Sequence, residues 1–354
     1  MTSRQEQNSG TREVRDAHRF DEAKLDAWLA SHVAGYRGPL SVRQFRGGQS
    51  NPTYLLETPT QRYVLRRKPP GKLLKSAHAV DREFRVISAL YAADFPVPRP
   101  YALCEDDEII GTTFFVMAFV AGRIFWELDL PGCSAAERSA IYDDVNRTIA
   151  RLHNYDYVAL GLGDFGKPGN YFQRQISRWI GQYRASETRA IPAMDALIDW
   201  LPEHIPTDDS SSIVHGDFRL DNMIIHPTEP KVIAVLDWEL STIGHPLADF
   251  TYHLLPWNMP ELGIGSVGLQ GKDLDALGIP AEDDYVRDYC RRTHREGIAH
   301  RGFYAAFNLF RLAAILQGIA GRVRDGTAAS AHARQAEQAV EPLARLGNAY
   351  TGAG

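Results

Sequence analysis

Two short apolar runs, residues 223–225 and 232–236, lie close together in the chain with a turn between them. This pattern predicts a β-hairpin. A loop precedes the hairpin, with Asp217 and Asn222 at its two ends, and Asp237 follows the second run directly. We therefore expect these three oxygen-bearing side chains to converge on one point.

Side chains of this kind suit a metal-assisted transfer of phosphate. Magnesium prefers hard oxygen ligands and fills its remaining positions with water or phosphate oxygens. Two protein ligands, Asn222 and Asp237, are therefore enough where ATP supplies the others. Asp217 is then left to orient and deprotonate an alcohol that is aimed at the γ-phosphate. The pattern predicts ATP and Mg2+ as cofactors and a small hydroxyl compound as acceptor.

The order of these motifs resembles a known family. H-x-D-x-x-x-x-N followed by an aspartate at the end of a later strand is similar to the catalytic and metal loops of protein kinases. It is more similar to the aminoglycoside phosphotransferase and choline kinase family of that fold. The similar motifs are His215-Gly216-Asp217, Asn222, Asp237-Trp238-Glu239 and the G-x-P-x-x-D segment at residues 244–249. The resemblance implies that Asp249 accepts backbone hydrogen bonds near the catalytic loop and that His215 braces this loop.

The first third of the chain is predicted to form a mainly antiparallel sheet with one long helix. Strand-forming residues occupy 40–45, 53–57, 62–67, 101–104 and 113–119, and apolar residues recur at helical spacing over 76–92. Helices dominate after Gly122. We expect the α+β class, and the resemblance implies a bilobal, protein-kinase-like fold. The expected parts are a disordered tail (1–19), an N-terminal nucleotide-binding lobe (20–120) and a C-terminal catalytic and acceptor-binding lobe (121–354).

The predicted N-terminal lobe contains candidate nucleotide-binding residues. Backbone and side-chain donors of a glycine-containing turn could fold over phosphates, and this turn is Gly47-Gly48-Gln49-Ser50-Asn51. The family resemblance places Arg66 at the position of the phosphate-binding lysine and Glu83 at that of its helix partner, with Lys68 as the alternative cation. It also implies that Met117 lines the adenine pocket. The Ala118 carbonyl and the Val120 amide would then hydrogen-bond adenine.

Composition and charge exclude several classes of function. A formal net charge of -5 and a pI of about 6.2 argue against a general nucleic-acid binder. No apolar run approaches the roughly 20 residues that span a bilayer, and the polar first residues do not resemble a signal peptide. Three widely spaced cysteines predict neither disulfides nor a zinc cluster. We expect a cytoplasmic enzyme with no membrane or nucleic-acid partner, and the oligomeric state stays open.

The acceptor is constrained less well. Residues 47–54, 66–72 and 76–83 resemble the kinase-like domains fused to some acyl-CoA dehydrogenases, which implies a hydroxyacyl-CoA acceptor. Residues 286–345 carry ten Lys plus Arg against five Asp plus Glu, and residues 303–323 are largely apolar apart from Arg311 and Arg322. A basic and partly apolar segment in the acceptor-binding lobe favours an acyl or anionic alcohol over a polycation as the acceptor. The alternatives are a nucleotide-binding pseudokinase or scaffold and an aminoglycoside 3'-type phosphotransferase. A protein kinase is disfavoured because Asp237 is followed by Trp238-Glu239, where the protein-kinase signature would read D-F-G, and because A-P-E does not occur in the sequence.

Overall fold

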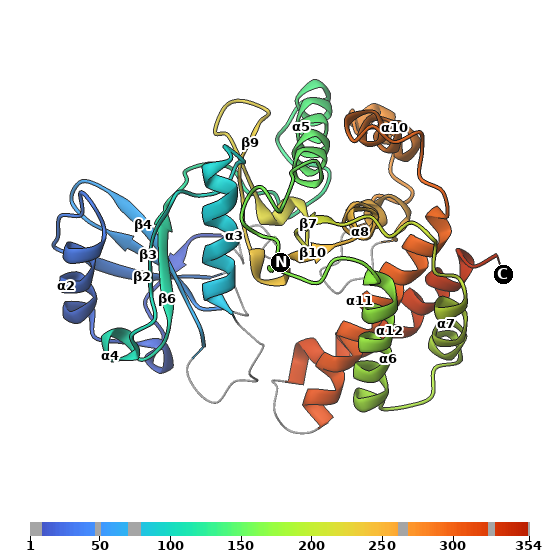
Figure 1. The fold of residues 1–354 in the computed structure, drawn as a ribbon, viewed down its shortest axis with the longest axis horizontal. Coiled ribbons are helices and arrows are strands. Elements are labelled where there is room, and N and C mark those ends of the chain that lie inside the picture. The colour runs from blue at the N-terminus through green and yellow to red at the C-terminus, as the bar shows by residue number, and fades with distance from the viewer. Residues whose placement is uncertain (1–8, 47–50, 70–78, 261–267, 325–329, 353–354) are drawn as a thin grey trace. The chain divides into compact units, whose positions relative to one another are not determined.

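A computed structural model describes residues 9–46, 51–69, 79–260, 268–324 and 330–352 (Figure 1). Contacts group the chain into two compact units. The first unit takes the described residues up to Pro131 together with residues 158–165 and 219–241, and the second takes the remainder. Each unit therefore contains stretches that are separated in the sequence, whereas the prediction divided the chain once, at residue 120.

The first unit is built on a six-stranded antiparallel sheet in the order β1-β2-β3-β4-β6-β5. Its strands are β1 (Thr11–Arg12), β2 (Ser41–Phe45), β3 (Thr53–Glu57), β4 (Arg62–Arg67), β5 (Pro100–Cys104) and β6 (Phe114–Ala118). Its helices are α2 (Glu22–His32), α3 (Val80–Ala92) and the short α4 (Asp107–Ile110). The predicted α+β class and the five predicted strands are confirmed.

Alternation along the strands sorts the side chains of this sheet onto two faces. Tyr54, Tyr63 and Val116 belong to the buried cluster that packs against α2. Leu55 is paired with Val64, and Val64 with Met117, so these side chains form a row on the opposite face. Figure 1 shows α2 and α3 on either side of the sheet. The row that contains Met117 therefore faces away from the α2 core.

The predicted disordered tail is wrong for part of its length. Thr11 and Arg12 pair with Phe45 and Gln44, which makes β1 an edge strand of the sheet. A 3₁₀ turn follows at Asp16–His18. Arg67 and Tyr54 each donate a hydrogen bond of 3.1 Å to the carbonyl oxygen of His18. Backbone pairing holds this segment, and its side chains carry no apolar pattern that would have predicted a strand.

The predicted hairpin is confirmed and belongs to the first unit. It consists of β8 (Met223–Ile225) and β9 (Val232–Val235). Arg123 and Ile225 exchange two backbone hydrogen bonds of 2.8 Å, which tie the hairpin to the segment after β6. Gly122 permits this approach, because a Cβ at that position would lie 2.4 Å from the Ile225 carbonyl oxygen. The hairpin thus stays with the sheet although a long stretch of chain separates them.

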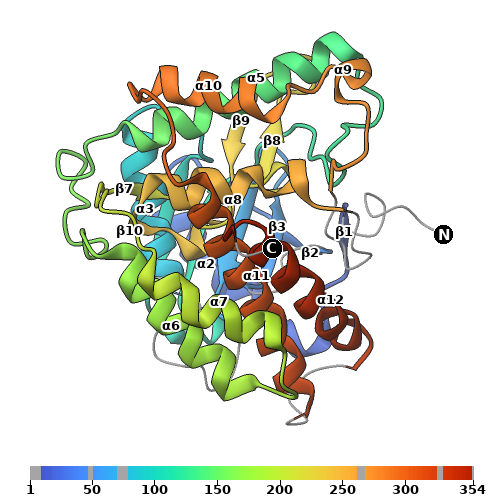
Figure 2. The same ribbon diagram turned by 90° about the vertical axis from the view of Figure 1, so that its right-hand side faces the viewer.

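The second unit is mainly helical. Its helices are α5 (Ala135–His153), α6 (Tyr171–Ser186), α7 (Pro192–Glu203), α8 (Pro246–Asn258), α9 (Leu274–Leu277), α10 (Glu282–Arg292), α11 (Arg301–Arg324) and α12 (Ser330–Ala349). A two-stranded sheet joins β7 (Ser212–Val214) and β10 (Thr242–Gly244). Helix α10 packs on α5, and α11 packs on α6, α8 and α12 (Figure 2).

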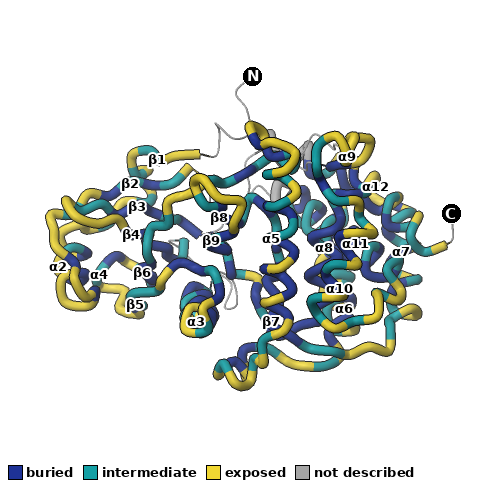
Figure 3. Tube along the Cα trace, turned by 90° about the horizontal axis from the view of Figure 1, so that it is seen from above, coloured by how far each residue is buried: buried dark blue, intermediate teal, exposed yellow. Residues whose placement is uncertain are grey.

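Helix α11 is the centre of this unit. Its segment Arg301–Gly321 is long and apolar enough to cross a membrane by length and composition, which the search for apolar runs in the sequence did not anticipate. However, 61% of the segment is buried inside the protein. Phe303, Phe307 and Phe310 are almost fully buried, and buried residues predominate along α8 and α11 in Figure 3. Its apolar character is therefore that of a core helix.

Candidate active site

A cavity of about 500 Å³ lies within the first unit. Its apolar wall includes the row formed by Leu55, Val64 and Met117 on the sheet. Four polar residues also line the cavity: Arg66, Glu83, Asn222 and Asp237. The cavity therefore combines an apolar slot with a charged region, as the base and the phosphates of a nucleotide require.

Arg66 is the centre of the charged region. Its Nε lies 2.8 Å from Glu83 Oε2, and its Nη2 pairs with Asp237 and lies 3.5 Å from Glu239 Oε2. Only 8% of the Arg66 side chain and 1% of the Glu83 side chain are exposed. Burial disfavours the charged form of Arg66, but the neighbouring carboxylates outweigh this effect and raise its pKa. Burial also raises the pKa of Glu83, because it outweighs the opposite effect of the Arg66 charge. Three carboxylates around one guanidinium leave negative charge that a cation could offset.

The alternative cation does not reach this region. Lys68 pairs with Asp81 at 3.3 Å, and the side chains are 28% and 41% exposed. It does not line the cavity. Asn51, in contrast, donates a hydrogen bond of 3.0 Å to Glu239 Oε2. Of the predicted glycine-containing turn, Gly47, Gly48, Gln49 and Ser50 lie outside the described residues.

The predicted hinge segment lines the same cavity. Met117, Ala118 and Val120 all contribute to its wall. The Ala118 amide is already used, because it donates a hydrogen bond of 2.8 Å to the Arg99 carbonyl. Among the described residues, no hydrogen bond occupies the Val120 amide. A donor next to an apolar slot is what an adenine ring needs along its edge.

The two predicted metal ligands are brought to this cavity by the hairpin. Met223 pairs with Val235, and the Leu236 amide donates a hydrogen bond of 2.8 Å to the Asn222 carbonyl. Asn222 and Asp237 thus stand at adjoining strand ends. Asp237 adopts a left-handed conformation with φ of 67°. In the described part of the chain, no three His, Cys, Asp or Glu side chains form a metal cluster. Two oxygen ligands with an excess of negative charge fit a magnesium ion that shares its coordination with phosphate oxygens.

Asp217 belongs to the second unit, where its loop is held by buried polar groups. Asp249 accepts backbone hydrogen bonds from His215 (2.7 Å) and Gly216 (2.8 Å). The His215 ring, which is fully buried, accepts the amide hydrogen of Asp217 at Nδ1 (3.2 Å). His153 lies 3.3 Å from Asp249, and hydrogen bonds and charge from the histidines keep the pKa of Asp249 low despite its burial. These contacts agree with the bracing roles expected for Asp249 and His215.

Two further residues contact this loop: Tyr252 was not predicted from the sequence, and Arg311 was noted only as a cation in an apolar segment. The Tyr252 hydroxyl donates a hydrogen bond of 2.8 Å to Asp217 Oδ1. Arg311 Nη2 donates one of 2.8 Å to the Gly216 carbonyl. The spacing of Tyr252 from Asp249, three residues on one helix, was an available signal for the first. For Arg311 the only signal was a cation within an apolar helix.

Comparison with known proteins gives a consistent result. The model of the phosphotransferase enzyme family (APH) matches residues 41–296. Acyl-CoA dehydrogenase family member 10 of Mus musculus is 45% identical over 337 residues, which are 95% of this chain and 32% of that protein. Family member 11 of Rattus norvegicus is 44% identical over 347 residues, covering 95% and 44%. The chain thus spans less than half the length of these relatives.

Solved structures show the same fold. A crystal structure from Ralstonia eutropha JMP134, described as a candidate aminoglycoside phosphotransferase, is 55% identical with a TM-score of 0.87, and covers 94% of this chain and 99% of its own. Choline kinase from Cryptosporidium parvum has a TM-score of 0.61 at 12% identity, covering 93% and 96%. Aminoglycoside phosphotransferase APH(4)-Ia, crystallised with ADP and hygromycin B, has a TM-score of 0.59 at 17% identity, covering 94% and 99%. The last two similarities concern the fold alone.

Proposed function

Because the chain belongs to the phosphotransferase enzyme family, we propose that it transfers the γ-phosphate of ATP to the hydroxyl group of a small, non-polycationic acceptor. The observation that carries this proposal is the cavity of the first unit. It brings together seven predicted residues from distant parts of the sequence: Arg66, Glu83, Met117, Ala118, Val120, Asn222 and Asp237. A cavity unrelated to nucleotide binding would not be expected to be lined by all seven of them.

Each part of the cavity has a role in holding the nucleotide. Adenine lies against Met117 and accepts a hydrogen bond from the Val120 amide. Arg66, oriented by Glu83, binds phosphate oxygens, for which its planar guanidinium is suited. The turn at residues 47–51 supplies further donors to the phosphates.

Magnesium would be held by Asn222 and Asp237. Bound there, the ion would supply positive charge that neutralises the charge developing during transfer. The contact between Arg66 and Asp237 keeps this carboxylate oriented toward the cavity.

Asp217 is the proposed base. It accepts the proton of the acceptor hydroxyl, so that the alcohol oxygen can attack the γ-phosphorus. Its carboxylate is suited to this because His215 and Asp249 fix the backbone on which it is carried.

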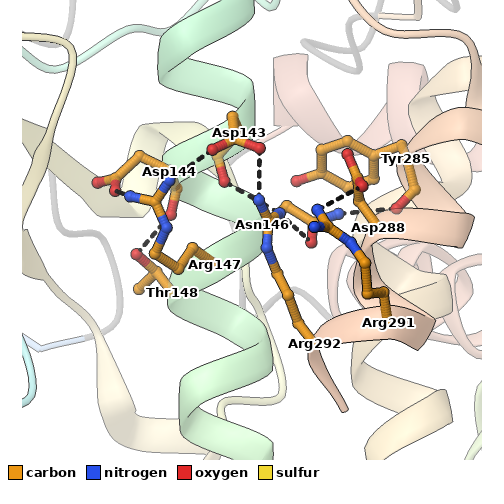
Figure 4. A network of polar contacts seen from close by, with 9 residues as sticks. All are labelled: Asp143, Asp144, Asn146, Arg147, Thr148, Tyr285, Asp288, Arg291 and Arg292. Atoms are coloured by element: carbon orange, nitrogen blue, oxygen red, sulfur yellow. Dashed lines mark hydrogen bonds and ion pairs between the residues drawn. The ribbon is translucent and has the colours of Figure 1, made fainter. Parts of the chain in front are cut away.

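The nature of the acceptor is argued from charge. Most described arginines of residues 286–345 are neutralised, as the network between α5 and α10 illustrates: Arg292 pairs with Asp143, and Arg291 with Asp288 (Figure 4). Arg311 differs, because it is 9% exposed, bonds to the Gly216 carbonyl and forms no ion pair with a described carboxylate. A buried cation that bonds to the residue before Asp217 would repel a polycationic acceptor. It would tolerate or attract an acyl thioester or a phosphate-bearing alcohol.

We therefore propose a hydroxyacyl-CoA as the acceptor class, in keeping with the resemblance to the acyl-CoA dehydrogenase relatives. The test is kcat/KM for a 4-hydroxyacyl-CoA and for a kanamycin-like aminoglycoside at equal ionic strength. We expect the acyl-CoA value to be higher, and we expect Arg311→Gln to narrow the difference. A higher value for the aminoglycoside would reject this acceptor class and favour the activity ascribed to the Ralstonia protein.

A pseudokinase or scaffold is the competing function. It would bind nucleotide in the cavity and release no ADP in the presence of any acceptor. An ADP-release assay across hydroxy acids, hydroxyacyl-CoAs, choline, sugars and aminoglycosides separates the two. A cytoplasmic location and the absence of nucleic-acid and membrane partners remain predictions.

A further inference from the structure

One helix of the second unit holds the loop that carries Asp217. Asp249, Tyr252 and His253 are spaced three and four residues apart on α8, so they share one face of the helix. Asp249 accepts the backbone amides of His215 and Gly216. His253 Nδ1 lies 3.2 Å from the Phe218 carbonyl and donates to it. Two of these residues therefore hold backbone groups on either side of Asp217.

Tyr252 is different because it touches the carboxylate itself. Its hydroxyl donates a hydrogen bond of 2.8 Å to Asp217 Oδ1. Tyr252 is half-buried, whereas its neighbours Thr251 and His253 are buried. A hydrogen bond to a carboxylate is stronger than one between neutral groups, and it favours the ionised form. This contact can therefore fix both the orientation and the charge of Asp217.

The ring of Tyr252 is in turn held by α11. The Arg311 guanidinium carbon lies 5.4 Å from the centre of the Tyr252 ring and 5.9 Å from that of Trp179. Both distances are within the range of cation–π attraction. The same guanidinium donates to the Gly216 carbonyl at 2.8 Å. Arg311 thus contacts the loop backbone and the tyrosine that bonds to its carboxylate.

We propose that Tyr252 is a positioning residue for Asp217, and that Arg311 holds Tyr252 in place. The inference rests on the proposed function, in which Asp217 is the base. In the reaction the acceptor O–H bond breaks and its proton passes to the Asp217 carboxylate. The alcohol oxygen bonds to the γ-phosphorus, and the bond to the bridging oxygen breaks with its electron pair leaving on ADP. Tyr252 keeps its own proton and holds the carboxylate in the orientation that meets the alcohol.

The test is Tyr252→Phe, which removes the hydroxyl and keeps the ring against Arg311. A hydrogen bond to a charged group is worth roughly 10- to 100-fold, so kcat should fall by about that factor. KM for ATP should stay unchanged, and the acid limb of the pH–rate profile should move to higher pH by about one unit. The other groups near the loop, His215, Asp249, His253 and Arg311, are unchanged in this variant. An unchanged kcat with an unshifted acid limb would overturn the proposal.

A matched control is available in the first unit. The Tyr36 hydroxyl also donates to an aspartate, Asp26, away from the cavity-lining residues. Tyr36→Phe should leave kcat and the pH profile unchanged. An equal effect of both variants would mean that loss of a tyrosine hydroxyl acts through general stability, and the positioning role would be rejected.

A second measurement does not depend on activity. The pKa of the Asp217 carboxyl can be followed by 13C NMR titration of protein labelled at aspartate, with Asp217→Asn identifying its signal. We expect a higher pKa in Tyr252→Phe, and a lower one with a more acidic fluorotyrosine at position 252, which retains the native shape. An unmoved pKa in both would overturn the proposal even if the enzyme is a kinase. Wild-type turnover by Asp217→Asn would instead overturn the assignment of the base, while the titration still tests the contact.

Discussion

Removal of the Arg66 side chain should destabilise the first unit and weaken ATP binding together. Arg66→Ala leaves the almost fully buried Glu83 without its ion-pair partner, and removes the guanidinium that contacts Asp237 and Glu239. Loss of one member of a buried ion pair costs about 3–5 kcal/mol of unfolding free energy. Burial has already raised the pKa of Glu83, so this carboxyl can take up a proton in the variant. We therefore expect a loss near the lower end, about 3 kcal/mol at pH 7.

The assay is urea unfolding followed by circular dichroism at several pH values. In Arg66→Ala, Glu83 should bind a proton more readily in the folded than in the unfolded chain. The loss of stability should therefore shrink as the pH is lowered. Adding Glu83→Gln to Arg66→Ala should recover part of the loss, because a neutral amide replaces the unpaired charge. Arg66→Lys should retain more ATP affinity than Arg66→Ala, since it keeps the positive charge.

Two results would refute this reasoning. An unfolding free energy of Arg66→Ala within about 0.5 kcal/mol of wild type, the range of ordinary surface substitutions, would mean that the ion pair is not a structural element. Unchanged KM for ATP in both Arg66→Ala and Arg66→Lys would mean that another cation binds the phosphates. Lys68 would then become the candidate despite its surface pair with Asp81.

Three further predictions follow from the described contacts. Magnesium should increase the ATP affinity of Asp237→Ala at least about 10-fold less than that of wild type, because mutation of residues that only contact a metal ligand already costs about that factor. Calorimetry with and without magnesium measures the two affinities. Gly122→Ala should cost about 1–3 kcal/mol because its Cβ would overlap the Ile225 carbonyl, whereas Gly181→Ala, with open space around it, should be neutral or stabilising; thermal unfolding compares them. Burial lowers the pKa of His253 to about 4, so the unfolded chain takes up this proton first as the pH falls below about 6.5. Wild-type stability should therefore fall with pH between about 6.5 and 4, and His253→Gln should reduce that slope by about 1.4 kcal/mol per pH unit.

Much of the fold could be predicted because its strands and helices follow from local patterns of apolar residues. The strands of the sheet and the β8–β9 hairpin were predicted from runs of β-forming residues, and α3 from apolar residues at helical spacing. Strand β1 could not be predicted in this way, because it is held by backbone pairing to β2 and by donors from Arg67 and Tyr54 to the His18 carbonyl. Such bonds leave no trace in the local sequence.

The candidate site was predictable where it follows an ordered motif. Asn222 and Asp237 are placed by a hairpin that the sequence specifies, and Arg66 and Glu83 were paired through the family resemblance. Tyr252 and Arg311 were harder to connect with Asp217, because the contacts span 35 and 95 residues and depend on how α8 and α11 pack. The charge of residues 286–345 was also misleading when counted along the chain. Arg292 and Arg295 are neutralised by Asp143 and Asp208, which lie outside the counted segment.

The most direct test of the central claim is detection of the γ-phosphate of ATP on the acceptor hydroxyl by mass spectrometry. The mixtures would contain ATP, magnesium and a 4-hydroxyacyl-CoA with wild type, with Asp217→Asn, or with Asp164→Asn, which removes an exposed carboxylate paired with Arg85. We predict phosphorylated acceptor with wild type and Asp164→Asn, and a rate at least about 100-fold lower with Asp217→Asn, as for loss of a general base. Asp217→Asn should still bind ATP with magnesium. Phosphorylated acceptor formed by Asp217→Asn at more than about half the wild-type rate would contradict the account, as would wild type that binds ATP and phosphorylates no member of the hydroxyl panel.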